Sequence, residues 1–327
     1  MAAMSIREPR PRTRALIRAA VGIGILIAVF LQVGAGPFLR GLEAVSPATI
    51  AAAFALTAIA TAAAAWRWTL IAKRLGVPIG PAVAVGAYYR SQFLNCVIPG
   101  GIVGDVHRAV DHGRSVGRVG QASRAVAAER IGGQAVQIVF AVAVLALIGV
   151  WVFAPLLGGL LGVLAVVAVV ALVTAAVSPR ARRAVRCEIA VARIAFHGAG
   201  VQVVVAATSV IVVVCHAATF VVACLAVGVR ATPPQLAAVA LLTVLAGSIP
   251  LGIGGWGPRE VVAAWAFTSV GLQAADGIAA STAFGVLATI ALVPGAVVLA
   301  ASVIRRPRRR DLPPAAPPLP ARQESSA

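Results

Sequence analysis

Long uncharged apolar runs dominate this chain of 327 residues, of which 60% are hydrophobic and only 12% are charged. Several runs reach about 20 residues, the length that an α-helix needs to cross the hydrocarbon core of a bilayer. The runs are continuous and do not alternate, which argues against the two-residue period of a membrane β-barrel. We therefore expect an all-α polytopic membrane protein.

Apolar run length predicts about six full spans and two shorter, interrupted segments. The full spans lie at about residues 16–34, 48–66, 133–153, 156–177, 200–228 and 279–303, and the interrupted segments lie at about 82–98 and 235–270. The sequence therefore divides into a basic N-terminal tail (1–15), a transmembrane domain (16–304) with halves at 16–153 and 156–304, and a basic, proline-rich tail (305–327) that we expect to be disordered.

A pattern of proline, glycine and arginine occurs twice, 151 residues apart. Residues 99–108 and 250–259 both read Pro-x-Gly-Ile-x-Gly-x-x-x-Arg, and each copy interrupts or follows a short apolar segment. Paired segments of this kind in the two halves of a membrane protein are typical of substrate sites at the interface of inverted repeats. The residues expected to break the helices are Pro99, Gly104, Pro250, Gly252, Gly254, Gly255 and Pro258.

Basic residues gather in the loops on one side of the predicted spans. With the N-terminus inside, all of the 28 lysines and arginines except Arg40, Arg230 and Arg259 fall on the cytoplasmic side. This bias predicts a protein of the cytoplasmic membrane with both termini in the cytoplasm. Segment 82–98 then enters from the cytoplasm and returns, whereas 235–270 enters from outside and returns. This inverted, re-entrant arrangement predicts a water-accessible cavity between the two segments, because irregular backbone at membrane depth must be covered by protein or face water.

Several functional classes are disfavoured by the sequence. The net charge of +18 lies in loops, where it serves orientation and contact with anionic lipids, so we do not expect nucleic-acid binding. His107 and His112 flank Asp111 without the spacing of a metal site, and there is no phosphate loop, nucleophile elbow or HExxH motif. We expect no metal, no cofactor and no catalytic residues, as in a transporter.

The first candidate site surrounds the predicted break at Pro99. A broken helix exposes backbone N–H groups that attract anions such as phosphate, and arginines add charge-assisted hydrogen bonds. The candidate substrate-binding residues of this block are Arg90, Asn95, Gly100, Gly101, Asp105 and Arg108. The alternative is a tight turn without function, in which Asp105 only neutralises Arg108.

Two further charged pairs complete the candidate site. Arg259 and Glu260 follow Pro258, which we expect to open a helix, and their burial is costly unless they pair with a ligand or with each other. Glu129 and Arg130 precede the span at 133–153. Glu129 could pair with Arg108, Arg124 or Arg130, and an ion pair at a helix start is the simpler interpretation.

Two single residues receive a structural interpretation. Arg67 lies between Trp66 and Trp68 at the predicted inner end of a span, which is the pattern of an interfacial aromatic belt. His216 lies within an apolar span and is interpreted as a hydrogen-bonded core histidine and not as a proton relay.

These motifs resemble the lysylphosphatidylglycerol-synthase transmembrane family, a flippase-like family. The matching blocks are Asn95-x3-Pro99-Gly-Gly-x2-Gly104-Asp105-x2-Arg108, Glu129-Arg130 and Pro250-x-Gly-x-Gly-Gly-x-Gly-x-Arg259-Glu260, within a resemblance that covers most of residues 15–304. The family is similar to the flippase half of the multiple peptide resistance factor, whose membrane domain moves aminoacylated phosphatidylglycerol between leaflets while a separate soluble domain makes that lipid.

The resemblance implies a lipid translocase without aminoacyl transfer. Its expected partners are membrane lipids with an anionic or lipid-linked headgroup, either a phospholipid or a polyprenyl-linked lipid, and further candidates are a second copy of the chain or a protein of envelope biosynthesis. The alternative is a non-transporting scaffold of a cell-envelope lipid or glycan pathway, which needs no water-filled cavity. A membrane enzyme acting on a polyprenyl phosphate would need an acid/base or metal cluster that the residue spacing does not supply.

Overall fold

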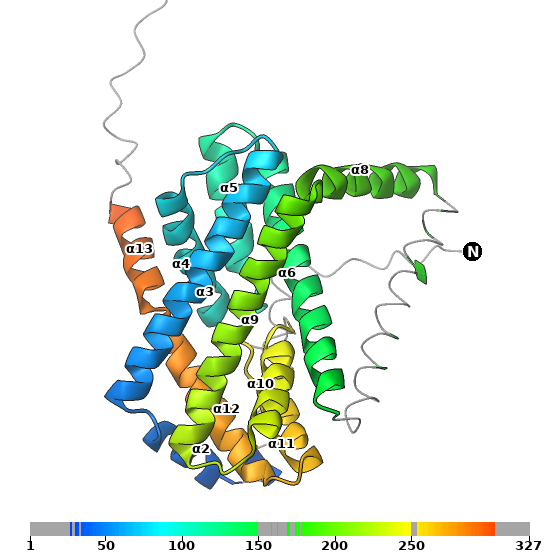
Figure 1. The fold of residues 1–327 in the computed structure, drawn as a ribbon. Helices are drawn as coiled ribbons and strands as arrows, with labels where there is room; N and C mark the ends of the chain where they lie inside the picture. Colours follow the sequence, from blue (N-terminus) through cyan, green and yellow to red (C-terminus); the bar gives the residue numbers. More distant parts are fainter. Residues whose placement is uncertain are drawn as a thin grey trace, which may run out of the picture.

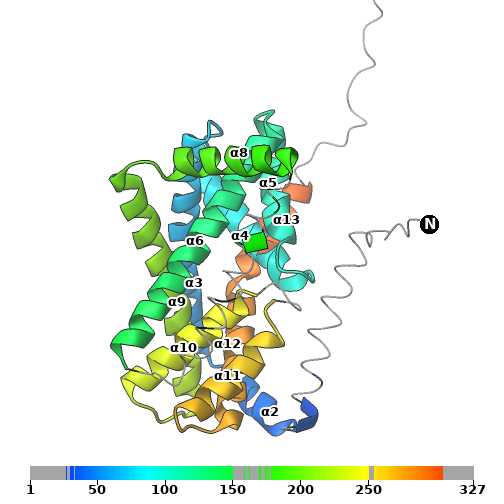
Figure 2. The same cartoon turned by 90° about the vertical axis from the view of Figure 1, so that its right-hand side faces the viewer.

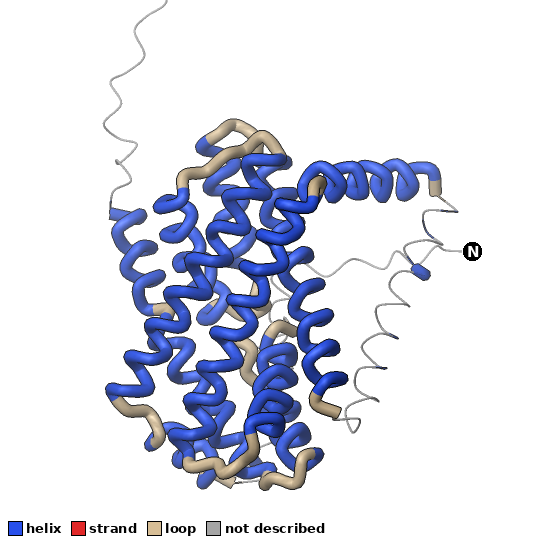
Figure 3. The backbone as a smooth tube through the Cα atoms, viewed as in Figure 1, coloured by secondary structure: helices blue, strands red, loops and turns tan. Residues whose placement is uncertain are grey.

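The computed structural model describes residues 27, 30–32, 34–149, 178–249 and 254–304, with isolated positions between 158 and 176. The elements assigned within these ranges are helices (Figure 3). They are α2 (Gly36–Glu43), α3 (Pro47–Arg74), α4 (Pro81–Val97), α5 (Val103–Ser115), α6 (Val119–Leu147), α8 (Pro179–Phe196), α9 (Ala199–Val227), α10 (Pro233–Gly247), α11 (Pro258–Ser269), α12 (Ala274–Ala291) and α13 (Val293–Ile304).

Local sequence explains where many of these helices begin and end. Helices α3, α4, α8, α10 and α11 each start at a proline, which is well tolerated there because the first helical N–H has no partner within the helix. Ser46 and Thr49 form a capping box on α3, and Thr232 and Gln235 form one on α10. Helix α9 ends at Gly228, whose φ of +88° provides the left-handed C-cap that glycine favours.

Two short helical hairpins enter the bundle from opposite ends. Helices α3, α6 and α9 run along its length, the α4–α5 hairpin occupies the upper end in Figure 1, and the α10–α11 hairpin occupies the lower end. The view turned by 90° shows the same separation (Figure 2). The hairpin tips meet near the middle, where a Cβ atom placed on Gly254 would lie 2.9 Å from the carbonyl oxygen of Cys96.

Apolar packing is concentrated in two clusters, one around each hairpin. Trp68 and Ile71 belong to a cluster that joins α3 and α4 to α6, whereas Phe220 and Phe267 belong to a larger cluster that joins α9 to α10, α11 and α12. Much of both clusters is alanine, and such small residues let helix backbones approach closely. The region between the two clusters is therefore available for polar groups.

The outer faces of the long helices are apolar and exposed. Ile59 on α3, Val139 on α6 and Val203 on α9 are each more than half exposed, as expected where helices face lipid. Among the described residues, four segments are long and apolar enough to cross a membrane, at Pro47–Arg74, Val119–Leu147, Ala199–Val227 and Ala274–Ser302. The prediction of a multi-pass helical membrane protein is confirmed.

Individual boundaries agree with the prediction to different degrees. The span expected at 200–228 is α9, and the one expected at 279–303 is divided into α12 and α13. For the span expected at 133–153 the predicted start was wrong, because α6 begins at Val119. The span expected at 48–66 corresponds to α3, which continues to Arg74. The spans expected at 16–34 and 156–177 lie outside the described residues apart from a few positions.

The first interrupted segment also differs from its prediction. Residues 82–98 correspond to α4 alone, and the return arm is α5, which the sequence analysis assigned to a basic cytoplasmic loop. In contrast, the segment expected at 235–270 contains both arms of the second hairpin. Helix α5 has low hydropathy because it is rich in charged residues, but its buried Asp105 and Arg108 have ion-pair partners inside the bundle.

Candidate functional site

A cavity of about 310 Å³, lined by both apolar and polar side chains, lies between the tips of the two hairpins. Its walls come from α3, α4, α6 and α9, and the tip of α10–α11 and part of α12 close it. The volume is at the lower end of the range of about 300–1,000 Å³ that is typical of small-molecule sites. A cavity at this place agrees with the expectation from the sequence.

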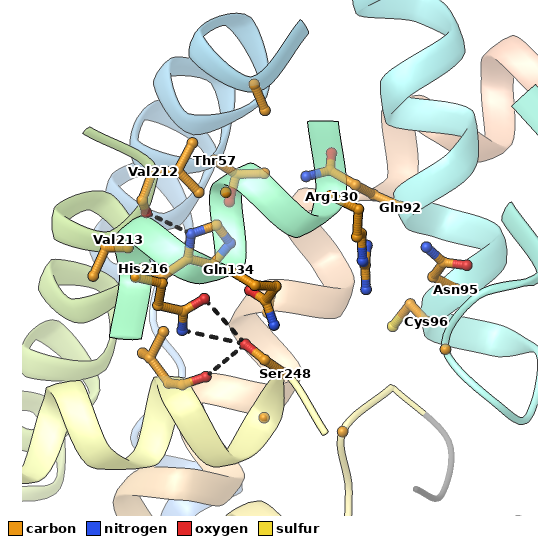
Figure 4. Close-up of a pocket in the computed structure, with 18 of the residues that line it drawn as sticks. Thr57, Gln92, Asn95, Cys96, Arg130, Gln134, Val212, Val213, His216 and Ser248 are labelled. Carbon is orange, nitrogen blue, oxygen red and sulfur yellow. Dashed lines mark hydrogen bonds between the residues drawn. The ribbon is translucent and has the colours of Figure 1, made fainter. Parts of the chain in front are cut away.

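The cavity lining combines cationic side chains with neutral polar side chains. Figure 4 shows Arg130, Asn95 and Cys96 together with His216, Gln134 and Ser248. Arg67 and Arg259 also belong to the lining. The cavity is thus bounded by cationic groups and by neutral groups that can both donate and accept hydrogen bonds.

The tip of the α4–α5 hairpin is stabilised from within. Gly100 and Gly101 have φ values of +104° and +61°, a region that other residues rarely adopt. The Asn95 Oδ1 atom accepts a hydrogen bond from the Gly104 N–H at 2.7 Å, and its Nδ2 donates to Asp105 Oδ2 at 3.1 Å. The start of α5, expected from the sequence to attract an external anion, is therefore partnered by the chain's own side chains.

Glu129 is the centre of a buried ion-pair network. This carboxylate is fully buried on α6 and forms ion pairs with Arg67 of α3 and with Arg108 of α5, the second at 2.6 Å. The hydroxyl of Tyr88 donates to it at 3.0 Å, and Arg67 Nη1 donates to Ser209 on α9 at 2.8 Å. One carboxylate thus connects four helices, and its pairing with the arginines offsets the desolvation cost of burying these charges.

Arg108 is held behind this network and does not line the cavity. Its side chain is fully covered, and its guanidinium carbon lies 4.8 Å from the ring centroid of Trp68 and 4.3 Å from that of Tyr88. Such cation–π contacts are stronger where water is excluded. Asp105 pairs with Arg108 at 3.1 Å and with the half-exposed Arg130 at 2.8 Å, which links the covered network to the cavity lining.

Arg259 occupies a comparable position on the second hairpin. Its Nη2 atom donates to Glu260 at 2.7 Å, and its Nε donates to Ser281 on α12 at 3.0 Å. Glu260 also accepts the Gly257 N–H at 2.7 Å, so it caps α11 while it neutralises the arginine. The Arg259 guanidinium lies 4.8 Å from the ring centroid of Trp256.

The charges around the cavity leave a positive excess. Four guanidinium groups, those of Arg67, Arg108, Arg130 and Arg259, face the carboxylates of Glu129, Asp105 and Glu260. Each of these three carboxylates is engaged by at least one arginine, and one positive charge remains. A cavity with this surplus favours an anion over a cation.

Comparison with known proteins gives the family. Residues 15–309 match the family described as the lysylphosphatidylglycerol synthase TM region. The chain belongs to this family. No curated protein and no solved structure matches it. The family membership, together with the four apolar spans, identifies a membrane protein of the flippase-like domain type.

The structure of this family member separates the predicted site residues into two groups. Those that line the cavity are Asn95, Gly101, Glu129, Arg130, Gly254, Gly255 and Arg259. Those that lie outside the lining are Arg90, Pro99, Gly100, Gly104, Asp105, Arg108, Pro258 and Glu260. Pro250 and Gly252 lie outside the described residues. A direct part in substrate binding stays a prediction for Asn95, Gly101, Glu129, Arg130 and Arg259.

Two of the predicted site residues, Arg90 and Glu129, form ion pairs with residues of α5. Arg90 forms an ion pair with Asp111 of α5 at 2.5 Å, on the side of α4 away from the lining. Glu129 pairs with Arg108, one of the partners expected from the sequence, but it lies well inside α6, so an ion pair at a helix start was the wrong interpretation. The alternatives in which Asp105 pairs with Arg108 and Glu260 pairs with Arg259 describe the geometry correctly.

Arg67 is the most important lining residue that sequence reasoning missed. It was assigned to an interfacial belt, but it is 5% exposed and its neighbour Trp68 is fully buried, while only Trp66 faces outward. Residues 69–72 continue the apolar run after Trp68, which indicates that Arg67 lies within the helix and not at its end. Gly133 on α6 provides the space, since a Cβ there would lie 2.8 Å from the Arg67 guanidinium.

The histidines have structural partners. His216 Nδ1 contacts the Val212 carbonyl oxygen at 2.7 Å, so the prediction of a hydrogen-bonded core histidine is confirmed, although the residue also lines the cavity. His112 Nε2 contacts the Val77 carbonyl oxygen at 3.0 Å. Within the described ranges, no three His, Cys, Asp or Glu side chains come together as a metal site.

Proposed function

We propose that this protein is a lipid translocase that moves the headgroup of a phospholipid or polyprenyl-linked lipid across the cytoplasmic membrane. The observation that carries the proposal is the cavity of about 310 Å³, with arginines and neutral polar groups in its lining, between hairpins at opposite ends of the bundle. A headgroup bound in this cavity is shielded from the hydrocarbon core of the bilayer, while the acyl chains of the same lipid extend between the helices into the bilayer.

The arrangement of the hairpins supports an alternating mechanism. The two halves form an inverted repeat in this proposal, with α4–α5 and α10–α11 as corresponding hairpins. Contact between the tips at Cys96 and Gly254 separates the two sides of the membrane. Rocking of one hairpin against the other then opens the cavity to each leaflet in turn.

The charged lining supports transport of an anionic or lipid-linked group. Arg130 is the lining arginine with the greatest freedom, because 41% of its side chain is exposed. Its guanidinium replaces the water that a phosphate loses on entering the cavity. Glu129 is held by two arginines, which favours a permanent structural carboxylate over a catalytic acid or base, so we propose transport without catalysis.

Reconstitution in liposomes tests this proposal. Trace lipids carry a fluorophore on an acyl chain, which leaves the headgroup unchanged, and dithionite destroys the fluorophore in the outer leaflet. Wild-type protein should raise the fraction of label that dithionite reaches. Arg130→Gln should slow this exchange by about ten-fold or more, as expected for the loss of a charge-assisted contact.

A matched control lies on the same helix. Arg124 is on the exposed part of α6 and pairs with Glu188 at the surface, so Arg124→Gln should exchange lipid as wild type does. Equal slowing of both variants would point to general damage. Absence of exchange for every phospholipid and polyprenyl lipid, with folded protein, would favour the non-transporting scaffold.

A further inference from the structure

Besides its arginines, the cavity lining carries neutral polar side chains that can form hydrogen bonds with a bound molecule. Gln134 on α6 makes no hydrogen bond to any other residue in the part of the chain that the structure describes. It belongs to the lining, one helical turn after Arg130 on the same face of α6 (Figure 4). Its amide therefore offers donors and an acceptor to whatever occupies the cavity.

His216 and Ser248 extend this neutral surface. Because the Val212 carbonyl can only accept, His216 Nδ1 is the donor in that contact, which leaves Nε2 of the neutral ring as an acceptor. Ser248 hydrogen-bonds to Gln137 at 3.2 Å, and both residues line the cavity beside Gln134. Groups of this kind pair well with hydroxyls, which need one donor and one acceptor each.

No carboxylate of the described lining remains for a positively charged headgroup. Glu129 is the carboxylate in the lining, and Arg67 and Arg108 engage both of its oxygens. Asp105 and Glu260 are similarly held by arginines behind the lining. An ammonium group that entered this cavity would meet a net positive charge and lose its hydration without a counter-ion.

From the arginine excess and the neutral polar groups of the lining we infer the substrate class. It is a lipid whose headgroup is a monoanionic phosphodiester bearing hydroxyl groups, and not an aminoacylated or amine-containing headgroup. This inference rests on the proposed function. The phosphodiester carries the single negative charge that the arginine excess requires, and it contacts Arg130 and Asn95. The hydroxyls of an attached glycerol or sugar contact Gln134 and His216.

Four acyl-labelled lipids, compared in the same liposome assay, test the effects of the headgroup hydroxyls and of the ammonium group separately. Phosphatidylglycerol has the phosphodiester and hydroxyls, phosphatidylmethanol has the phosphodiester without hydroxyls, phosphatidylethanolamine adds one ammonium group, and lysylphosphatidylglycerol adds two. Phosphatidylglycerol should exchange about 2- to 10-fold faster than phosphatidylmethanol, the effect of one or two hydrogen bonds between neutral groups. The two ammonium lipids should exchange more slowly than both.

A matched pair of variants on α6 assigns the hydroxyl contact. Gln134→Leu should slow phosphatidylglycerol exchange more than phosphatidylmethanol exchange, so that the ratio of the two rates falls toward one. Gln121 is exposed on α6 outside the lining, so Gln121→Leu should alter neither rate. A purely structural role of Gln134 would slow both lipids equally, which would overturn the assignment.

The outcomes distinguish this inference from the function on which it rests. Exchange of lysylphosphatidylglycerol or phosphatidylethanolamine at least as fast as that of phosphatidylglycerol would overturn the inference and leave translocation standing. Exchange of none of the four lipids by folded protein would overturn both. If Gln134→Leu fails to fold, the wild-type ratio of phosphatidylglycerol to phosphatidylmethanol decides alone, and a ratio of one contradicts the inference.

Discussion

Gly254 on one hairpin lies directly against Cys96 on the other. A Cβ atom placed on Gly254 would be 2.9 Å from the Cys96 carbonyl oxygen and 3.3 Å from its Sγ. The two positions are 158 residues apart in the sequence, so the contact depends on the whole bundle. It brings the tips of α4 and of the segment before α11 together at the edge of the cavity.

The first prediction uses the native thiol at this contact. The Gly254→Cys variant should form a disulfide with Cys96 under mild oxidation, because the two side chains are within bonding range after a small shift. The new residue must adopt a φ near +58°, which costs about 1–2 kcal/mol, so a moderate loss of thermal stability is also expected. Loss of maleimide-reactive thiols on a mass-shift gel measures the cross-link.

The control for this cross-link removes its partner. A variant with both Gly254→Cys and Cys96→Ala should keep its added thiol reactive after oxidation. In liposomes, the oxidised Gly254→Cys protein should exchange lipid more slowly, and a reductant should restore exchange. Thiols that stay fully reactive in Gly254→Cys would contradict the contact between the tips.

The second prediction concerns the space for Arg259. A Cβ atom on Gly285 of α12 would lie 2.3 Å from Arg259 Nη2 and 2.7 Å from the Trp256 ring. Gly285→Ala should therefore displace the arginine from Glu260 and destabilise the protein by about 1–3 kcal/mol. Thermal unfolding in detergent measures the change.

Gly86 provides the matched control in another helix. A Cβ there would meet only Val298 Cγ1 at 3.8 Å, an ordinary contact. Because alanine is a better helix former than glycine, Gly86→Ala should be neutral or stabilising by up to about 1 kcal/mol. Equal loss of stability in both variants would show that Gly285 has no special role beside Arg259.

The third prediction concerns the ion-pair network around Glu129. Glu129→Ala leaves Arg67 and Arg108 as buried charges without this partner, so it should destabilise the protein by about 3–5 kcal/mol. Glu188→Ala breaks a pair of similar chemistry on the exposed side of α6 and α8, and should change stability by no more than about 1 kcal/mol. A shift of the unfolding temperature that is equal for both would contradict the buried network.

Sequence reasoning predicted much of the fold because hydropathy reports the long helices directly. Helix α9, expected at 200–228 and observed at Ala199–Val227, contains no charged residue, so run length alone defines it. Helix α5 was missed because Asp105, Arg108 and Asp111 lower its hydropathy. Hydropathy counts a charge as a cost but does not record that a partner on α4 or α6 offsets it.

The candidate site was predicted only in part for a related reason. The motifs drew attention to Asn95, Arg130 and Arg259, which do line the cavity. The lining also includes Arg67, Gln134 and His216, which lie in the long helices outside the proline- and glycine-rich motifs. Their place at the cavity follows from which face of α3, α6 and α9 turns inward, and this depends on packing between helices far apart in the sequence.

The fourth prediction tests the orientation proposed from the basic loops. Cys187 lies exposed on α8, which crosses the upper end of the bundle in Figure 1, whereas Cys215 and Cys224 are buried. If that end is cytoplasmic, a variant with Cys187 as its only cysteine should react with a membrane-impermeant maleimide only after cells are permeabilised. Substitution of Cys96, Cys215 and Cys224 by alanine provides this background.

A cysteine at the lower end of the bundle should show the opposite labelling pattern. Arg230 is exposed in the connection between α9 and α10, at the lower end of the bundle. In a variant that carries Arg230→Cys as its only cysteine, labelling should occur in intact cells, because the positive-inside bias places this connection outside. Labelling of Cys187 in intact cells, with Arg230→Cys protected, would invert the proposed orientation and assign the α4–α5 hairpin to the outer leaflet.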